Sequence, residues 1–245
     1  MDIPSGLDHI KMLAAITEHN RGLSASKLDS VKEYLNIVGV SLAILYQAGT
    51  CHRKCFGGAH ILESLSGRAY NLGCSAYILI CRGFYDEALN LVRGIGEIAN
   101  LVSLSVVDKD ALQRWIKSDT RTRLRDFSPA KIRKLLEEHE PLLLCADRDW
   151  YSNFCESYTH VHAGTKPNAH NDDNKAHVGG VVQDKGLNDS VSELATVSAK
   201  LAMLVSKYTE MNDMFSMLCE SIGGVEGAAN KALKPTVHKA GPRLS

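Results

Sequence analysis

Residues 59–106, AHILESLSGRAYNLGCSAYILICRGFYDEALNLVRGIGEIANLVSLSV, decide the fold of this 245-residue chain. Apolar residues recur at spacings of three and four on both sides of a short break at Arg82 and Gly83, which predicts two helices, over residues 59–81 and 85–106. So short a connection makes them an antiparallel hairpin of a helical bundle. The second helix is apolar on nearly every side, so we expect it inside the bundle.

Helical periodicity continues through most of the chain, and no segment alternates with period two between hairpin turns. We therefore expect an all-α fold, an up-and-down helical bundle. The pattern predicts further helices over residues 5–19, 24–49, 108–118, 128–141 and 147–161. A polar, Gly-rich loop follows at residues 164–187, and loops of that length usually have a functional or flexible role.

The most regular pattern lies in residues 190–222, SVSELATVSAKLAMLVSKYTEMNDMFSMLCESI. Ser190 and Glu193 have capping-box spacing, and the apolar residues that follow form a heptad seam. One continuous helix of this length would extend roughly 50 Å. Its seam packs either within the chain or against a second copy, which would make a homodimer through this helix. Residues 1–224 are expected to form a single domain, followed by a flexible tail over residues 225–245.

Composition narrows the function classes. The 28 Lys and Arg residues balance 28 Asp and Glu residues, which argues against non-specific coating of a polyanion, although a local basic patch is compatible with it. The first residues lack a signal-peptide pattern, and the most apolar stretch, residues 35–48, is short of the roughly 20 residues that cross a bilayer. Seven cysteines, mostly in apolar helical segments, suit reduced thiols. We expect a cytoplasmic protein with no membrane partner.

The buried helix of the hairpin carries two charges, Arg93 and Glu97, four residues apart on one face. Burying either without a partner would cost several kcal/mol. The pair is therefore either an internal ion pair that fixes helix register or part of a polar pocket, and we predict Arg93 and Glu97 as candidate catalytic residues.

A second group of polar residues lies where the helix over residues 147–161 ends. On an α-helix Tyr158 shares a face with His162, and Ser157 shares one with His160. We predict His160 and His162 as catalytic and Ser157 and Tyr158 as binding residues. A metal site of His160, His162, His170 and His177 is a weaker alternative, because the spacing matches no zinc signature. The pair Cys51 and Cys55 has no second cysteine pair, so we interpret it as incidental.

The motif A-x-x-L-x-R-x-x-x-E, formed by Ala88, Leu91, Arg93 and Glu97, is followed by a helix ending in V-H-x-G at residues 161–164. This combination resembles a widespread group of uncharacterised bacterial all-α domains, which are similar in turn to the HEPN superfamily. That superfamily includes dimeric, metal-independent ribonucleases and toxins of defence and toxin–antitoxin systems. Its R-x4–6-H motif occurs here at Arg53 and His60 and at Arg133 and His139, which is about the number of matches that chance gives.

The resemblance implies a HEPN-like protein that cleaves RNA or processes a nucleotide without a cofactor. His162 or His160 would then be the general base, Arg93 would stabilise the negative charge at phosphorus, and Glu97 would orient Arg93. One alternative is a non-enzymatic, dimeric ligand-binding or protein-interaction module. Another is a metal-dependent hydrolase that uses the His- and Asp-rich loop.

Overall fold

The computed structural model describes residues 3–161, 163, 165–168 and 175–223. These residues contain helices and no strand, which confirms the all-α prediction. In chain order the elements are α1 (Gly6–Ala25), η1 (a 3₁₀ turn, Leu28–Val31), α2 (Lys32–Gly49), α3 (Ile61–Ile80), α4 (Tyr85–Val107), α5 (Ala111–Lys117), α6 (Thr120–Asp126), α7 (Pro129–His139), η2 (a 3₁₀ turn, Pro141–Leu143), α8 (Arg148–Phe154), η3 (a π-helical turn, Cys155–Thr159), α9 (Asp184–Tyr208) and α10 (Asn212–Gly223).

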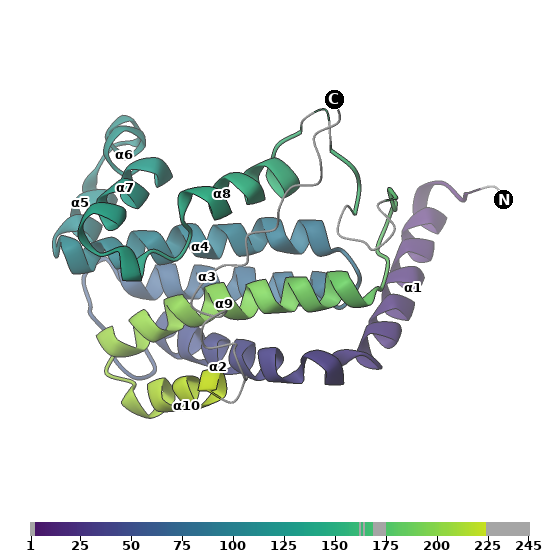
Figure 1. Ribbon diagram of the computed structural model, residues 1–245, viewed down its shortest axis with the longest axis horizontal. Coiled ribbons are helices and arrows are strands. Elements are labelled where there is room, and N and C mark those ends of the chain that lie inside the picture. The colour runs from purple at the N-terminus through teal and green to yellow at the C-terminus, as the bar shows by residue number, and fades with distance from the viewer. Residues whose placement is uncertain (1–2, 162, 164, 169–174, 224–245) are drawn as a thin grey trace.

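Helices α2, α3, α4 and α9 run side by side as the bundle, and α5 to α8 lie along one side of α4 (Figure 1). The predicted hairpin of α3 and α4 is confirmed. Its turn contains Gly83 with a φ of 77°, a backbone conformation that glycine adopts without strain. A Cβ atom there would lie 2.6 Å from the backbone of Val181, so the turn also needs a residue without a side chain.

Helix α4 forms the centre of the molecule. It packs against α3, α7, α9 and η3, and Leu89, Val92, Ile95 and Val102 are completely buried. Burial of each such side chain stabilises the fold by about 1.5–3 kcal/mol. Among the described residues α4 is also the one helix long and apolar enough to span a membrane, a test that core helices of soluble proteins pass as well.

Two predictions about the start of the last helix are wrong. Helix α9 begins at Asp184, so Ser190 and Glu193 are buried inside the helix and form no capping box. The long loop correspondingly ends at Gln183 instead of residue 187. The early start is stabilised by Tyr85, whose hydroxyl accepts a hydrogen bond from the Gln183 backbone N–H at 3.2 Å.

The single helix over residues 190–222 is also a wrong prediction. The chain leaves α9 at Thr209, and Glu210 adopts a left-handed conformation with a φ of 58°. The backbone N–H of Met211 donates to Ser206 O at 2.9 Å and that of Glu210 to Lys207 O at 3.3 Å, the bonds of a Schellman motif. Helix α10 then folds back against α2. The apolar period survives this turn, so the sequence pattern does not reveal it.

The apolar seam of these two helices packs within the chain. Leu194, Val197 and Leu201 of α9 and Leu218 and Ile222 of α10 are buried in the core of the single molecule. The homodimer stays a prediction, and it would require a surface other than this seam. Helix α1 leaves several large apolar side chains exposed at one end of the bundle, Leu7 and Ile10 among them (Figure 1).

The shorter helices differ from prediction in detail. Helix α6 was not predicted, since its sequence TRTRLRD lacks apolar periodicity; its N-terminus is capped by Asp119, which accepts a bond from the Thr122 backbone N–H at 2.7 Å. The expected helix over residues 147–161 is α8 followed by η3, a wider π-helical turn. The described part of the long loop lies on the α3–α4 turn, where buried Asn168 donates to Gly83 O at 3.1 Å. The predicted tail over residues 225–245 lies outside the described residues.

Replacing Gly186 with Ala tests the packing of α9 on α4. A Cβ atom at Gly186 would lie 2.3–2.9 Å from the ring of Tyr85, which is completely buried. We expect Gly186→Ala to lower the free energy of unfolding by about 1–3 kcal/mol, measured by urea denaturation. Gly39→Ala in α2 is the control, because a Cβ there meets no atom within 4 Å and should add up to about 1 kcal/mol of helix stability. Equal effects of the two substitutions would contradict this packing.

Candidate functional site

Arg93, Glu97 and Tyr151 form one hydrogen-bonded network between α4 and α8. Arg93 Nη1 donates to Glu97 Oε1 and to the Tyr151 hydroxyl, both at 2.8 Å. The Tyr151 hydroxyl in turn donates to Glu97 Oε1 at 2.8 Å. Arg93 Nη1 also lies 3.7 Å from Cys155 Sγ. The two charges on the central helix therefore have partners, as their burial requires.

The network is only partly shielded from solvent. The exposed fraction of the side chain is 18% for Arg93 and 34% for Glu97. Burial acts to lower the pKa of Arg93, but the nearby Glu97, Tyr151 and Cys155 outweigh it and hold the pKa above its ordinary value. Burial, together with the bond to Glu97, raises the pKa of Tyr151 to about 12. At neutral pH the guanidinium is therefore charged and the phenol keeps its proton.

A cleft of about 480 Å³ between α3, α4 and α7 opens onto this network, and we call it the arginine cleft. Arg68, Arg93 and Arg133 line it, against the single carboxylate of Glu97. The Arg133 guanidinium lies 4.1 Å from the centre of the Tyr151 ring, a cation–π contact. Arg93 thus takes part both in an ion pair and in the wall of a polar pocket, the two alternatives that the sequence left open.

Two guanidinium nitrogens of the arginine cleft are buried without a partner. They are Arg93 Nε and Arg133 Nη1, and neither has a hydrogen-bond acceptor among the residues that the structure describes. A buried donor left unsatisfied costs about 1–3 kcal/mol. An acceptor supplied by a ligand would remove that cost, which makes the cleft the candidate site for an anionic or strongly accepting group.

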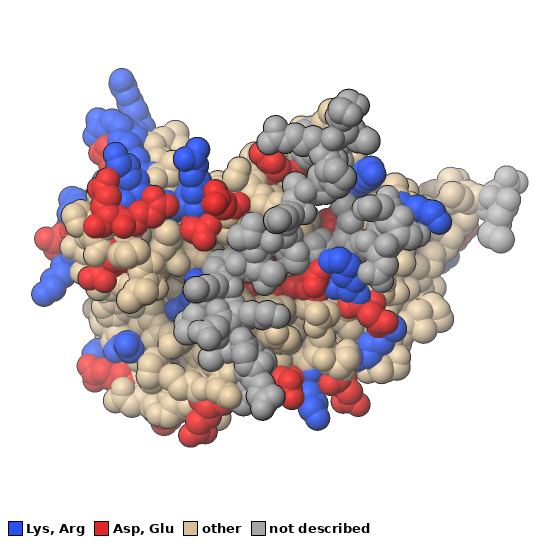
Figure 2. All heavy atoms as spheres, in the orientation of Figure 1, with Lys and Arg blue, Asp and Glu red and all other residues tan. Residues whose placement is uncertain are grey.

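Basic side chains gather on the helices next to the arginine cleft. Between residues 114 and 134 the chain has eight Lys or Arg residues and two Asp residues. The basic residues of this segment, which we call the basic lobe, are Arg114, Lys117, Arg121, Arg123, Arg125, Lys131, Arg133 and Lys134. In Figure 2 a group of Lys and Arg side chains projects from the region of α5, α6 and α7. Arg133 belongs both to the lobe and to the cleft wall.

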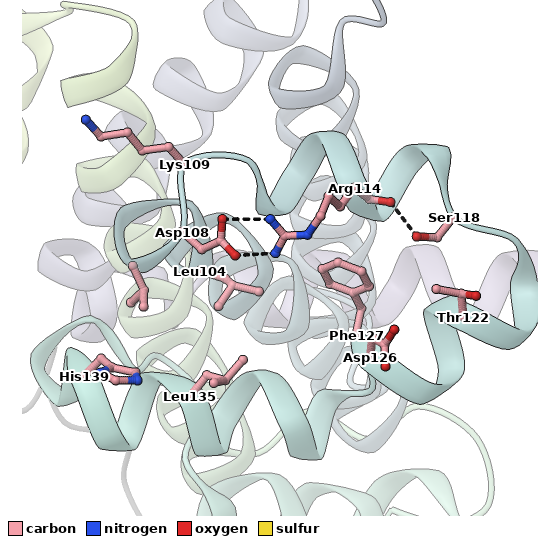
Figure 3. Close-up of a pocket in the computed structure, with 11 residues that line it drawn as sticks. Leu104, Asp108, Lys109, Arg114, Ser118, Thr122, Asp126, Phe127, Leu135 and His139 are labelled. Atoms are coloured by element: carbon pink, nitrogen blue, oxygen red, sulfur yellow. Dashed lines mark hydrogen bonds and ion pairs between the residues drawn. The ribbon is translucent and has the colours of Figure 1, made fainter.

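A larger hollow of about 820 Å³ lies between α5, α6 and α7 (Figure 3). There the guanidinium of Arg114 faces the carboxylate of Asp108 and donates to both of its oxygens. Both side chains are more than a third exposed, so the two charges neutralise each other in solvent. Within the described part of the chain, no residue lining this hollow has a buried polar atom without a partner. This hollow therefore offers a ligand fewer unsatisfied hydrogen-bond donors than the arginine cleft does.

The structure places the predicted residues of η3 on two different sides. Thr159 Oγ1 donates to Asn90 Oδ1 at 2.9 Å, so η3 lies along α4 beside the arginine cleft, which Asn90 lines. His160 follows directly, with an exposed side chain. Ser157 Oγ donates to Asn153 Oδ1 at 3.4 Å, which keeps its hydroxyl on α8 and η3. The directions of these side chains are those of a wider π turn, whereas the sequence predicted an α-helix here.

Tyr158 lies away from the arginine cleft. Its ring packs edge-on against Phe154 at a centroid distance of 5.2 Å, and burial followed by the charges of Asp86 and Glu193 raises its pKa well above the ordinary value. Glu193 is itself buried and accepts a bond from Trp150 Nε1 at 3.2 Å. Tyr158 therefore belongs to a second polar region, between the start of α4 and α9.

The remaining predicted histidines are only partly described. His162 and His170 lie outside the described residues. His177 lies in the loop, where its backbone N–H donates to Pro167 O at 3.1 Å. Among the described residues nothing joins His160 to His177, so the metal site of four histidines stays an untested prediction.

Sequence reasoning missed four residues of the site: Tyr151, Cys155, Arg68 and Arg133. Tyr151 and Cys155 are four residues apart on the helix whose aromatic face was recognised, so their polar atoms were a signal that went unused. Arg133 was interpreted as part of a solvated, charged helix. Its position at the cleft depends on how α7 packs on α4, which periodicity does not reveal.

Comparisons of the chain with models of protein families, with curated proteins and with solved structures found no match. The fold and the arrangement of side chains are therefore the grounds for a functional proposal.

Replacing Glu97 with Gln tests whether the network stabilises the protein. The substitution removes the negative charge of the carboxylate that accepts hydrogen bonds from both Arg93 and Tyr151. Hydrogen bonds to charged groups contribute about 1.5–3 kcal/mol each. Because the site is partly exposed, we expect a loss of about 1–3 kcal/mol in the free energy of unfolding. Glu137→Gln is the control, since Glu137 is exposed on α7 and surface changes stay within about 0.5 kcal/mol. A loss no larger than that of the control would show that the network does not contribute to stability.

Proposed function

We propose that this protein binds a phosphate group of RNA or of a nucleotide in the arginine cleft. The observation that carries the proposal is the pair of buried, unpartnered donors, Arg93 Nε and Arg133 Nη1, on a wall lined by three guanidinium groups. Guanidinium groups bind phosphate oxygens through two parallel hydrogen bonds, which gives geometric specificity as well as energy. The oxygens of a phosphate group would supply acceptors of the kind that these donors lack.

The basic lobe supports RNA, or another polyanion, over a small uncharged ligand. Three of its eight basic residues are in ion pairs, Arg114 with Asp108, Arg125 with Asp126 and Lys134 with Glu138. The other five attract phosphates even though the whole chain is neutral. Binding of this kind releases counterions, so its affinity falls as the salt concentration rises. The lobe adjoins the cleft through Arg133, so a strand that lies on the lobe would pass the mouth of the cleft.

The HEPN-like resemblance adds cleavage as the expected reaction. His162 or His160 would take the proton of a ribose 2′-hydroxyl, and the 2′-oxygen would attack phosphorus. The bond from phosphorus to the 5′-oxygen would break, and that oxygen would take a proton from water. Arg93 would stabilise the negative charge that develops on the phosphate oxygens, and Glu97 would orient Arg93. The contact of Thr159 with Asn90 supports this assignment, because it brings the end of η3 to the cleft.

Binding without cleavage is the second candidate. Tyr151, whose hydroxyl contacts Arg93, has a pKa of about 12 and is therefore unsuited to accept a proton at neutral pH. In this candidate the arginine cleft recognises its ligand and the protein acts as a ligand-binding or interaction module. The metal-dependent hydrolase is the third candidate, and the same experiments separate it from the other two.

Binding of a short, fluorescently labelled single-stranded RNA, measured by anisotropy at low and at moderate salt, tests the proposal. We expect Arg93→Gln and Arg133→Gln each to weaken binding about tenfold, which corresponds to about 1.4 kcal/mol. Arg133→Gln breaks no ion pair within the described residues, so it keeps the test valid if Arg93→Gln unfolds the protein. Competition with ATP and with free phosphate distinguishes a nucleotide from a strand.

The matched control for binding is Arg21→Gln. Arg21 is exposed on α1 and pairs with Glu18 at 2.7 Å, so the substitution removes the same charge far along the chain from the cleft. We expect its affinity to change less than about twofold. Equal weakening by all three substitutions, or no binding of RNA or nucleotide at low salt, would overturn the proposal.

Cleavage is tested by incubating total RNA with the protein in the presence of a chelator. Loss of a general base typically lowers a rate by about 100- to 10,000-fold, and we expect a loss of this size for His162→Ala, for His160→Ala or for both. Absence of cleavage by the wild-type protein would favour binding alone. Cleavage that requires an added metal ion would favour the hydrolase, and cleavage that survives loss of both histidines would contradict the assignment.

A further inference from the structure

A second group of reactive side chains lies in the connection between α2 and α3. The sulfur atoms of Cys51 and Cys55, a ring nitrogen of His60 and a carboxylate oxygen of Glu63 all lie within 4.8 Å of one another. His60 Nδ1 is 3.7 Å from Cys51 Sγ, 3.6 Å from Cys55 Sγ and 3.7 Å from Glu63 Oε1. Four side chains from a loop and the following helix thus point to a common centre.

These distances fit the edges of a tetrahedron around a metal ion. Zn²⁺ binds sulfur at about 2.3 Å and nitrogen or oxygen at about 2.0–2.2 Å, so its ligand atoms are roughly 3.3–3.8 Å apart. The three separations that involve His60 Nδ1 fall within that range, and the other three pairs of ligand atoms are within 4.8 Å. The two contacts of His60 Nδ1 with sulfur are also within hydrogen-bond reach, but the 3.7 Å from Nδ1 to Glu63 Oε1 is too long for a hydrogen bond between nitrogen and oxygen, so hydrogen bonding does not explain why the carboxylate lies at the imidazole.

Glu63 supplies an independent observation. Its side chain is 4% exposed, and Oε1 accepts a bond from the Phe56 backbone N–H at 2.7 Å. Oε2 is buried and has no hydrogen-bond partner in the part of the chain that the structure describes. A buried carboxylate without a counter-charge is costly, and no Lys or Arg pairs with it among the described residues. A divalent cation at the common centre would supply the missing charge.

The backbone of this connection is shaped to bring the four side chains together. Cys51 and His60 adopt left-handed conformations with φ of 56° and 47°, and Gly57 and Gly58 between them also have positive φ. A left-handed conformation costs a residue other than glycine about 1–2 kcal/mol. The loop therefore folds tightly back on itself, and the turn at His60 directs the imidazole to both sulfur atoms.

We propose that Cys51, Cys55, His60 and Glu63 bind one Zn²⁺ ion with tetrahedral geometry. Two thiolates, an imidazole and a carboxylate are the ligand types that zinc prefers, and a site with four protein ligands is structural. The ion cross-links the loop after α2 to the first turn of α3. From the sequence, Cys51 and Cys55 were interpreted as incidental because the chain has no second cysteine pair to complete a zinc site. The fold brings His60 and Glu63 to the two sulfur atoms instead.

Zinc content of the full-length protein, purified under reducing conditions without chelator, tests this proposal by mass spectrometry of the metal. We expect one zinc ion per chain, either as purified or after addition of one equivalent of ZnCl2 and removal of free metal. Cys51→Ser combined with Cys55→Ser should lose the ion. Cys219→Ser is the matched control, because Cys219 is an exposed free cysteine on α10 and the variant should keep its zinc.

Substitution with Co²⁺ keeps the test decisive if the double variant does not fold. In the wild-type protein we expect the visible absorption of tetrahedral Co²⁺ and sulfur-to-cobalt charge transfer, both displaced by one equivalent of Zn²⁺. Removal of the metal should lower the midpoint of thermal unfolding. A folded, reduced protein that binds neither ion, zinc retained by the double variant, or a Cys51–Cys55 disulfide in place of metal would overturn the proposal.

Discussion

The burial of two charges on the central helix is the constraint on which the rest of the structure depends. Arg93 and Glu97 lie on α4, whose other side chains fill the core, so the fold must bring polar partners to them. Tyr151 of α8 is that partner, and it reaches Arg93 because α8 lies close to α4. Gly96 permits the approach, since a Cβ atom there would lie 3.1 Å from the ring of Trp150. A glycine that weakens the helix thus allows the packing that satisfies the two charges.

The same constraint explains why an open cleft forms beside a packed core. Helices α5 to α7 cover α4 only partly, so Arg93 and Glu97 stay in contact with solvent. The total charge of zero conceals an uneven distribution, because residues 114–134 hold eight of the 28 basic residues and only two of the 28 acidic ones. The net charge alone therefore does not exclude a site that binds an anion, because the distribution of charge along the chain is uneven.

Much of the fold, and about half of the arginine cleft, follows from the sequence. The α3–α4 hairpin and the buried pair were predictable because one short turn and one continuous apolar helix leave few alternatives. The break between α9 and α10 was not, since the Schellman turn at Glu210 keeps the spacing of apolar residues that a straight helix would have. Tyr158 was predicted because on an α-helix it shares a face with His162, and a π turn changes which residues share a face. Each miss concerns backbone geometry that leaves the apolar pattern unchanged.

The candidate zinc site at Cys51 and Cys55 was missed in the sequence for a different reason. A zinc signature is recognised in sequence when all ligands recur at fixed local spacings. Here the loop contributes two sulfur atoms, and the donors that complete the set lie at the start of α3, where His60 precedes the helix and Glu63 lies in its first turn. The backbones of α2 and α3 come close on either side of this loop, since a Cβ at Gly49 would lie 2.8 Å from the backbone of Gly67. Arg68, which lines the arginine cleft, follows Gly67 directly. A cross-link at the start of α3 would therefore fix the helix that carries one wall of the cleft, so that rigidity of the loop and geometry of the arginine site are coupled through α3.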